Sequence, residues 1–279
     1  MNKLVKYLLP AAKIDMGGFP VKQALPTQNV PQVDPFLLLH HGKVKYSSRR
    51  PARHQGVDPH PHRGFSPVTF VVQGEVHHRD SRGNSQIAKA GEVQWIHAGA
   101  GIIHSERPSE AMAESGTHQE FIQIWINSPQ ESKMKIPEYI YIDNDSFKRT
   151  ESEDGFIKNK VIDDIGQSPL LIIWAEGQKK GTTTYQIPEG YNSAIYLIKG
   201  KMRIKGFGLL NDEHLAVFED KGDTIEVEMK EAGQFLILSG LPIDEKVVQS
   251  GPYVMNSETE ILEAMRDYQM GKMGILIEE

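Results

Sequence analysis

The sequence predicts an all-β protein made of two related barrels or sandwiches, with one short helix near its C-terminal end. Short apolar runs rich in β-branched and aromatic residues recur along the 279 residues, and turn-forming residues lie between them. Many short strands separated by turns are typical of a β-sandwich or β-barrel. The same pattern occurs in both halves of the chain, which suggests an internal duplication.

The first half begins with a stretch to about Pro35 that is rich in proline and glycine, a composition that favours turns and edge strands. Asp80–Asn84 has the composition of a hairpin turn. The strands expected in this half cover residues 35–39, 68–72, 92–96 and 120–126.

A polar segment over residues 129–168 is the expected connection between two domains. We therefore expect an N-terminal domain over residues 1–140 and a C-terminal domain over residues 141–279. The strands expected in the second half cover residues 170–174, 194–198, 225–228 and 235–238.

One helix is predicted after these strands. Ser257–Glu260 has the pattern of a capping box, which marks a helix start. Ile261, Met265 and Tyr268 form an apolar stripe at helical spacing, and Gly271 is placed to end the helix.

Composition excludes several classes of function. The formal net charge of −6 offers no general attraction to nucleic acid. The absence of cysteine excludes disulfides, zinc ribbons, cysteine-ligated iron–sulfur clusters and thiol nucleophiles. There is no apolar run of about 18 residues that could cross a membrane. The short apolar run near Met1 is too brief for a signal peptide, so we expect a soluble cytoplasmic protein.

Two pairs of polar residues are the strongest functional signal. His60 and His62 are separated by one residue, and so are His104 and Glu106. Residues i and i+2 of a strand point to the same side, so two neighbouring strands would bring all four side chains to one ion. Three nitrogens and one oxygen suit Fe, Mn, Co, Ni, Cu or Zn. An octahedral ion would keep two positions for water, substrate or dioxygen.

Each pair alone has a simpler explanation. Isolated His-x-His pairs are common on protein surfaces, and His104 with Glu106 could be a hydrogen-bonded pair at a strand end. The two pairs together favour a metal site. His77 and His78 alternate faces, and for His78 we expect a hydrogen bond near the hairpin rather than a metal.

The two halves differ in histidine content. The stretch from His54 to His118 contains eight histidines, whereas His214 is the only one after Pro169. Only the first half can therefore bind a metal in this way.

The segments around the two pairs resemble the pirins, a family of the cupin superfamily. The similarity lies in residues 58–65, in Gln94-Trp95 and in residues 99–106, and further matching stretches extend it over nearly the whole chain. The resemblance implies two tandem cupin β-barrel (jelly-roll) domains. It also implies one divalent metal ion, usually Fe(II), held in the N-terminal barrel by His60, His62, His104 and Glu106.

The chain departs from the family pattern beside these ligands. Ser66 and Pro67 stand where a glutamate and a threonine are expected, and His97 stands where a threonine is usual. We expect these positions to alter hydrogen bonds around the metal, the metal preference and the fit of the substrate.

The resemblance leads to two main hypotheses. The first is a metal-dependent dioxygenase that cleaves flavonols such as quercetin. The ion would lower the pKa of the substrate's 3-hydroxyl, Glu106 would accept its proton, and dioxygen would open the heterocycle with loss of carbon monoxide. The second is a metal-containing regulatory protein whose binding of a protein partner depends on the metal's oxidation state. A zinc hydrolase is weaker, because the sequence shows no separate general base such as that of His-Glu-x-x-His.

Overall fold

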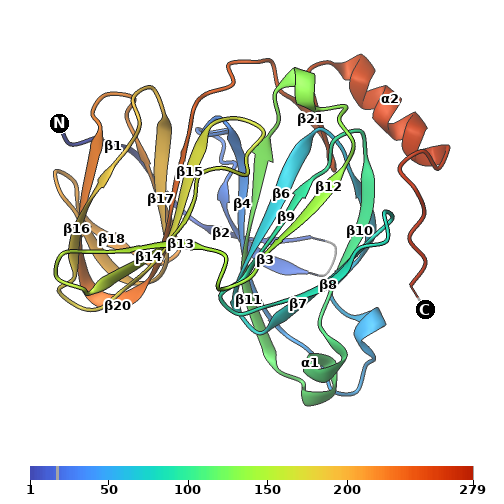
Figure 1. Ribbon diagram of the computed structural model, residues 1–279, viewed down its shortest axis with the longest axis horizontal. Helices are drawn as coiled ribbons and strands as arrows, with labels where there is room; N and C mark the ends of the chain where they lie inside the picture. Colours follow the sequence, from blue (N-terminus) through green and yellow to red (C-terminus); the bar gives the residue numbers. More distant parts are fainter. Residues whose placement is uncertain (17–18, 279) are drawn as a thin grey trace. The chain divides into compact units, whose positions relative to one another are not determined.

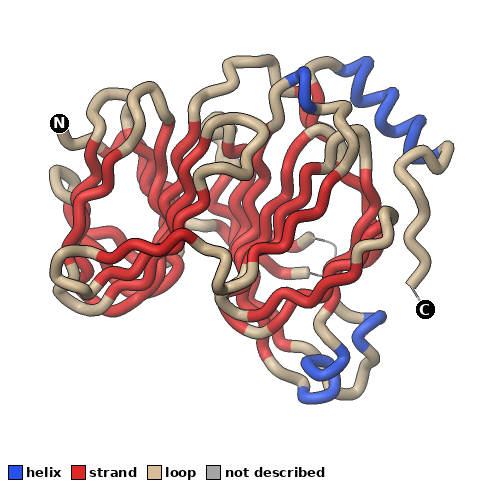
Figure 2. The backbone as a smooth tube through the Cα atoms, in the orientation of Figure 1, coloured by secondary structure: helices blue, strands red, loops and turns tan. Residues whose placement is uncertain are grey.

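The structure is a computed structural model that describes residues 1–16 and 19–278, and it consists mainly of β-strands (Figure 2). The chain divides into two compact units. Unit 1 contains Met1–Ala12, Lys22–Leu38 and Ser146–Ile243, and unit 2 contains Lys13–Val21, Leu39–Asp145 and the chain from Asp244 onward. Among the described residues, none of the helices has the length and apolar character needed to cross a membrane.

The predicted metal ligands lie in a four-stranded sheet, and a seven-stranded sheet supplies Thr69 and Gln123, which contact Glu106. Figure 1 labels most of the strands of both sheets. One has the order β12-β9-β6-β11-β4-β3-β2, the other has the order β5-β10-β7-β8, and β21 pairs with β22. The strands of these sheets are β2 (Ala12–Asp15), β3 (Pro20–Leu25), β4 (Phe36–Lys45), β5 (Val57–His62), β6 (Phe65–Gln73), β7 (Glu75–Asp80), β8 (Ser85–Lys89), β9 (Val93–His97), β10 (Ile102–Arg107), β11 (His118–Asn127), β12 (Glu138–Ile142), β21 (Val248–Ser250) and β22 (Tyr253–Met255). The helices are η1 (Ala52–His54), α1 (Glu110–Ser115), η2 (Gln130–Ser132) and α2 (Glu258–Gln269).

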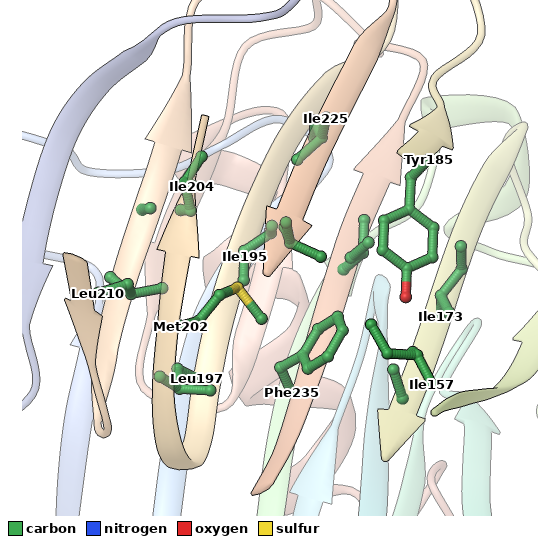
Figure 3. Packing of buried hydrophobic residues seen from close by; sticks show 14 of the residues in the cluster. Ile157, Ile173, Tyr185, Ile195, Leu197, Met202, Ile204, Leu210, Ile225 and Phe235 are labelled. Atoms are coloured by element: carbon green, nitrogen blue, oxygen red, sulfur yellow. The ribbon is translucent and has the colours of Figure 1, made fainter. Parts of the chain in front are cut away.

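Unit 1 is built on a sheet with the order β1-β19-β17-β20-β15-β14-β13, on which β16 pairs with β20 and β18 with β17. Its strands are β1 (Val5–Pro10), β13 (Lys148–Glu151), β14 (Ile157–Ile162), β15 (Leu170–Gly177), β16 (Thr182–Gln186), β17 (Asn192–Ile204), β18 (Gly208–Asn211), β19 (His214–Phe218) and β20 (Thr224–Gly240). The alternating apolar residues of these strands form one core, which includes Ile195, Met202, Tyr185 and Phe235 (Figure 3). The expectation of an all-β protein with two cupin-type domains and one C-terminal helix is confirmed.

The two units differ from the contiguous division expected at residue 140. The first strand, β1, pairs with β19 and belongs with the second half of the chain. Helix α2 belongs with the first half, because Ile261 and Ala264 pack against Ile103 of β10. The terminal segments thus each join the unit formed by the opposite half of the sequence.

The ends of α2 follow the sequence prediction. The Ser257 hydroxyl accepts a hydrogen bond from the backbone N–H of Glu260, as a capping residue does. Gly271 follows the helix with a φ of 73°, a conformation that glycine adopts without steric cost.

The predicted apolar stripe of α2 is only partly buried. Ile261 is buried, whereas Met265 and Tyr268 are 36% and 39% exposed. Asp267 is buried instead, and its Oδ2 accepts a hydrogen bond of 3.1 Å from Arg63. Ile261, Ala264 and Asp267 thus form the inward face of the helix, on which an ion pair with Arg63 adds to the apolar contacts.

A buried lysine joins three segments of unit 2. Nζ of Lys133 donates to Gly64 O at 2.7 Å, to Asn127 Oδ1 at 2.7 Å and to Val254 O at 3.1 Å. Its three protons therefore match three buried acceptors. These hydrogen bonds hold the segment after β11 against the loop before β6 and against β22.

We expect Lys133→Met to lower the free energy of unfolding by about 3 kcal/mol, because the acceptors lose their donor in a site closed to water. Urea denaturation measures this loss. The matched control is Lys135→Met, since Lys135 is exposed. Equal stability of the two variants would contradict the assignment of Lys133 as a structural anchor.

Candidate metal centre

The four predicted ligands lie on two neighbouring antiparallel strands. His60 and His62 end β5, and His104 and Glu106 lie on β10. His104 is directly opposite His60 in the register, and Ile102 is opposite His62. Pro61 restricts His60 to extended backbone, which keeps both histidines of β5 on one side of the strand.

Three imidazoles converge at this point. Ligand atoms of His60, His62 and His104 all lie within 4.8 Å of one another. Nε2 of His60 is 3.1 Å from Nε2 of His62. Nε2 of His104 is buried and has no hydrogen-bond partner among the described residues. A buried nitrogen lone pair without a partner is costly unless a cation or a hydrogen-bond donor occupies the space beside it.

The opposite ring nitrogen of each histidine is already engaged. Nδ1 of His60 lies 2.8 Å from Asp58 O, and Nδ1 of His62 lies 3.4 Å from Pro252 O. A carbonyl oxygen can only accept, so both Nδ1 atoms carry the proton in neutral rings. Both Nε2 atoms then present lone pairs, and lone pairs this close repel unless a cation lies between them.

A chain of hydrogen bonds fixes the same tautomer in His104. Asp80 Oδ2 accepts from His78 Nε2 at 2.9 Å, so the lone pair of neutral His78 is on Nδ1. His104 Nδ1 lies 3.4 Å from that atom and donates to it. Its Nε2 is therefore a lone pair facing the other two histidines. The predicted hydrogen-bonding role of His78 is confirmed.

Burial also keeps two of the histidines neutral. It lowers the pKa of His62 well below its usual range, and the neighbouring His60 lowers it further. Burial likewise lowers the pKa of His104, together with His60, His62 and His78. Neutral imidazole is the form that binds metal, so the three residues fit a divalent cation.

Asp80 is placed to orient His104 through His78. Burial by itself raises the pKa of Asp80, but hydrogen bonds from His78 and Asn84 bring it below its usual value. We expect Asp80→Asn to weaken metal binding about 10- to 100-fold, as is common for residues that orient a ligand. A chelator competition assay measures the loss, and Asp145→Asn, at an exposed position, is the control. Unchanged affinity in Asp80→Asn would refute the orienting role.

Glu106 occupies a separate position in the structure. Its Oε1 accepts a hydrogen bond of 3.1 Å from Thr69, and both carboxylate oxygens contact Gln123 Nε2, at 3.1 and 3.0 Å. It is not in the group of three histidines whose ligand atoms converge. The register between β10 and β5 shifts between His104 and Glu106. The structure therefore brings three of the four predicted ligands together.

A small cavity lies beside Glu106, with room for about one water-sized molecule. Its walls are mainly apolar. They are formed by Phe19, Val57, Val76 and Phe121, with polar atoms from Glu106, Thr69 and Gln119.

Aromatic side chains surround His62. Its ring lies 5.0 Å from that of Phe65 and 5.4 Å from that of half-buried Trp125, both in edge-on contact. These rings limit how far the imidazole can turn.

The three departures from the family pattern have different environments. Ser66 Oγ lies 2.8 Å from His97 Nδ1, so two of the departures interact with each other. Strand alternation places Ser66 on the opposite side of β6 from Phe65 and Thr69, which face the site. Pro67 shares the site's side. The influence of the three positions on the metal surroundings stays a prediction.

Comparison with known proteins gives the family. Residues 18–126 match the Pirin family, and residues 175–274 match the Pirin C-terminal cupin domain. The chain belongs to the pirin family. Pirin-1 of Arabidopsis thaliana is 35% identical over 97% of this chain and 94% of its own length.

Solved structures agree with this assignment. A crystal structure of a quercetin 2,3-dioxygenase from Acinetobacter baumannii has a TM-score of 0.91 and 32% identity, covering 99% of this chain and all of that chain. A bacterial pirin from Escherichia coli, crystallised in complex with nickel(II), has a TM-score of 0.67 and 20% identity, covering 85% of this chain and 99% of its own. The second similarity shows the shared fold.

Proposed function

We propose that this pirin is a metal-dependent dioxygenase that cleaves flavonols such as quercetin with dioxygen. The observation that carries the proposal is the convergence of three imidazole rings in unit 2, with Nε2 of His104 buried and without a hydrogen-bond partner among the described residues. The quercetin 2,3-dioxygenase from Acinetobacter baumannii, which is similar over its full length, supports the choice of reaction.

The metal we propose is Fe(II), with Mn, Ni, Co, Cu and Zn as alternatives that nitrogen ligands also accept. The nickel complex of the Escherichia coli pirin supports metal binding by this fold. In this chain His60, His62 and His104 would hold the ion, and Glu106 would join them if its side chain turned toward the histidines.

A bound divalent ion would supply Lewis acidity that favours the ionised form of a flavonol's 3-hydroxyl. Glu106 is the base that we propose for that proton. Thr69 and Gln123 orient its carboxylate through the hydrogen bonds described above, and Phe65 and Trp125 keep His62 in place. The apolar walls beside Glu106 exclude bulk water from the proton transfer.

The test is dioxygen uptake by the purified protein after reconstitution with each metal in turn. We expect quercetin-dependent uptake with at least one metal, and none in His62→Ala. Stoichiometric metal binding without uptake under any metal would overturn the enzyme assignment and leave the metal site standing.

A second function is favoured by the size of the cavity. The space beside Glu106 holds about one water-sized molecule, far less than a flavonol, and Phe19 and Phe121 border it. A metal-containing regulatory protein would need no larger space. On that proposal a protein partner binds with an affinity that depends on the oxidation state of the metal, and turnover is absent.

A further inference from the structure

The segment that follows α2, residues 270–278, runs beside β10, the strand that carries His104 and Glu106 (Figure 1). Side chains alternate along β10, so Ser105 and Arg107 point to the side opposite His104 and Glu106. We call residues 270–278 the tail segment. Its contacts are with this opposite side of the strand.

Met273 holds the first part of the tail segment. It is 2% exposed and belongs to the same buried cluster as Ile103. Its side chain also fills the space beside Gly101, where an added Cβ would lie 2.5 Å from Met273 Cγ. Ser81 completes this contact, because its hydroxyl donates to Met273 O at 2.7 Å and accepts from Ile103 N at 3.0 Å.

Glu278 holds the far end of the tail segment. Its carboxylate accepts hydrogen bonds from Ser105 Oγ at 2.5 Å and from Arg107 Nη2 at 2.6 Å. The side chain is 9% exposed and that of Arg107 is 7% exposed. A charge-assisted pair largely shielded from water is stronger than a surface ion pair, and removal of Glu278 would leave Nε and Nη2 of Arg107 without their carboxylate acceptor.

Arg107 connects this carboxylate to the other metal strand. Its Nη1 donates to Gln55 O at 3.0 Å and lies 2.8 Å from Asp58 Oδ1. Asp58 is the residue whose backbone oxygen accepts the hydrogen bond from His60 Nδ1. A series of contacts thus links Glu278 to Arg107, Arg107 to Asp58, and Asp58 to His60. A second contact links Glu278 to Ser105, the neighbour of His104 in the chain.

We propose that Glu278 is a positioning residue for the metal centre, so that docking of the tail segment and metal binding favour each other. The coupling is reciprocal by thermodynamic necessity: whatever factor the docked tail adds to metal affinity, the metal adds to tail docking. This inference rests on metal binding at the three histidines. Binding of the metal would thus change how firmly the tail segment docks at the surface of unit 2.

The first test compares metal affinity in Glu278→Gln and Glu263→Gln, measured with Co(II) against a competing chelator. Glu263 lies on the exposed side of α2 and serves as the matched control. We expect about tenfold weaker binding in Glu278→Gln, within the range of residues that orient ligands indirectly, and no change in the control. Equal affinity in wild type and Glu278→Gln would overturn the proposal.

The second test follows the tail segment itself, in the wild type and in Glu278→Gln. Hydrogen exchange of a peptide covering residues 270–278 is measured with and without Zn(II). We expect slower exchange with metal in the wild type and a loss of that effect in Glu278→Gln. Exchange that does not respond to bound metal would also overturn the coupling. A wild type that binds no metal would instead overturn the metal site itself, so the two failures are distinguishable.

Discussion

His104→Ala is expected to abolish stoichiometric binding of a divalent ion. The substitution removes one of the three converging Nε2 atoms and ends the hydrogen-bond chain from Asp80 through His78. The loss should exceed the about 10- to 100-fold effect of changing a residue that only orients a ligand. Elemental analysis after reconstitution and dialysis measures it directly.

The matched control is His214→Ala. His214 lies at the start of β19 in unit 1 and is the one histidine after Pro169. We expect this variant to bind metal as the wild type does. Full metal content in His104→Ala would contradict the three-histidine site, and loss of metal in His214→Ala would show that the ion binds elsewhere.

Glu106→Gln is expected to lower kcat for flavonol cleavage by about 10²- to 10⁴-fold, the usual contribution of a general base. Glutamine has nearly the same shape, so it can still contact Thr69 and Gln123. Metal affinity should fall far less than in His104→Ala, because the three imidazoles remain. Oxygen uptake and metal content, measured on the same preparation, separate the two effects.

The control for this variant is Glu114→Gln, at an exposed position of α1. A kcat for Glu106→Gln equal to that of the wild type would refute the proposed base. A loss of metal as complete as in His104→Ala would instead assign Glu106 the role of an indispensable ligand.

The histidine cluster could be predicted from the sequence because it depends mainly on residues that are close together within one strand. Residues i and i+2 of a strand share a side, and this places His60 with His62 without knowledge of the fold. This rule does not predict that β5 pairs with β10. The structure shows that pairing, with His104 opposite His60. The chain from His104 to His78 and Asp80 also had a local signal, since His78 and Asp80 are again two residues apart.

The contacts of the Glu106 side chain could not be predicted from strand alternation. Alternation along β10 places Glu106 on the same side as His104, but it does not say which partners its long side chain selects. Those partners, Thr69 and Gln123, come from β6 and β11. A strand pattern contains no information about such contacts between sheets.

Contacts between distant segments explain the other differences. Asp267 turns inward on α2 because it meets Arg63, which lies 204 residues away in the sequence. Glu278 meets Arg107 across 171 residues. Neither pair leaves a periodic signal, so the burial of Asp267 and the placement of α2 in unit 2 could not be read from hydrophobic spacing alone.

The most direct test of the metal centre is anomalous diffraction from crystals grown with Ni(II) or Co(II). The structure predicts one strong anomalous peak within bonding distance, about 2.0–2.2 Å, of Nε2 of His60, His62 and His104. A peak bound by other residues, or no peak near these three nitrogens at saturating metal, would contradict the account.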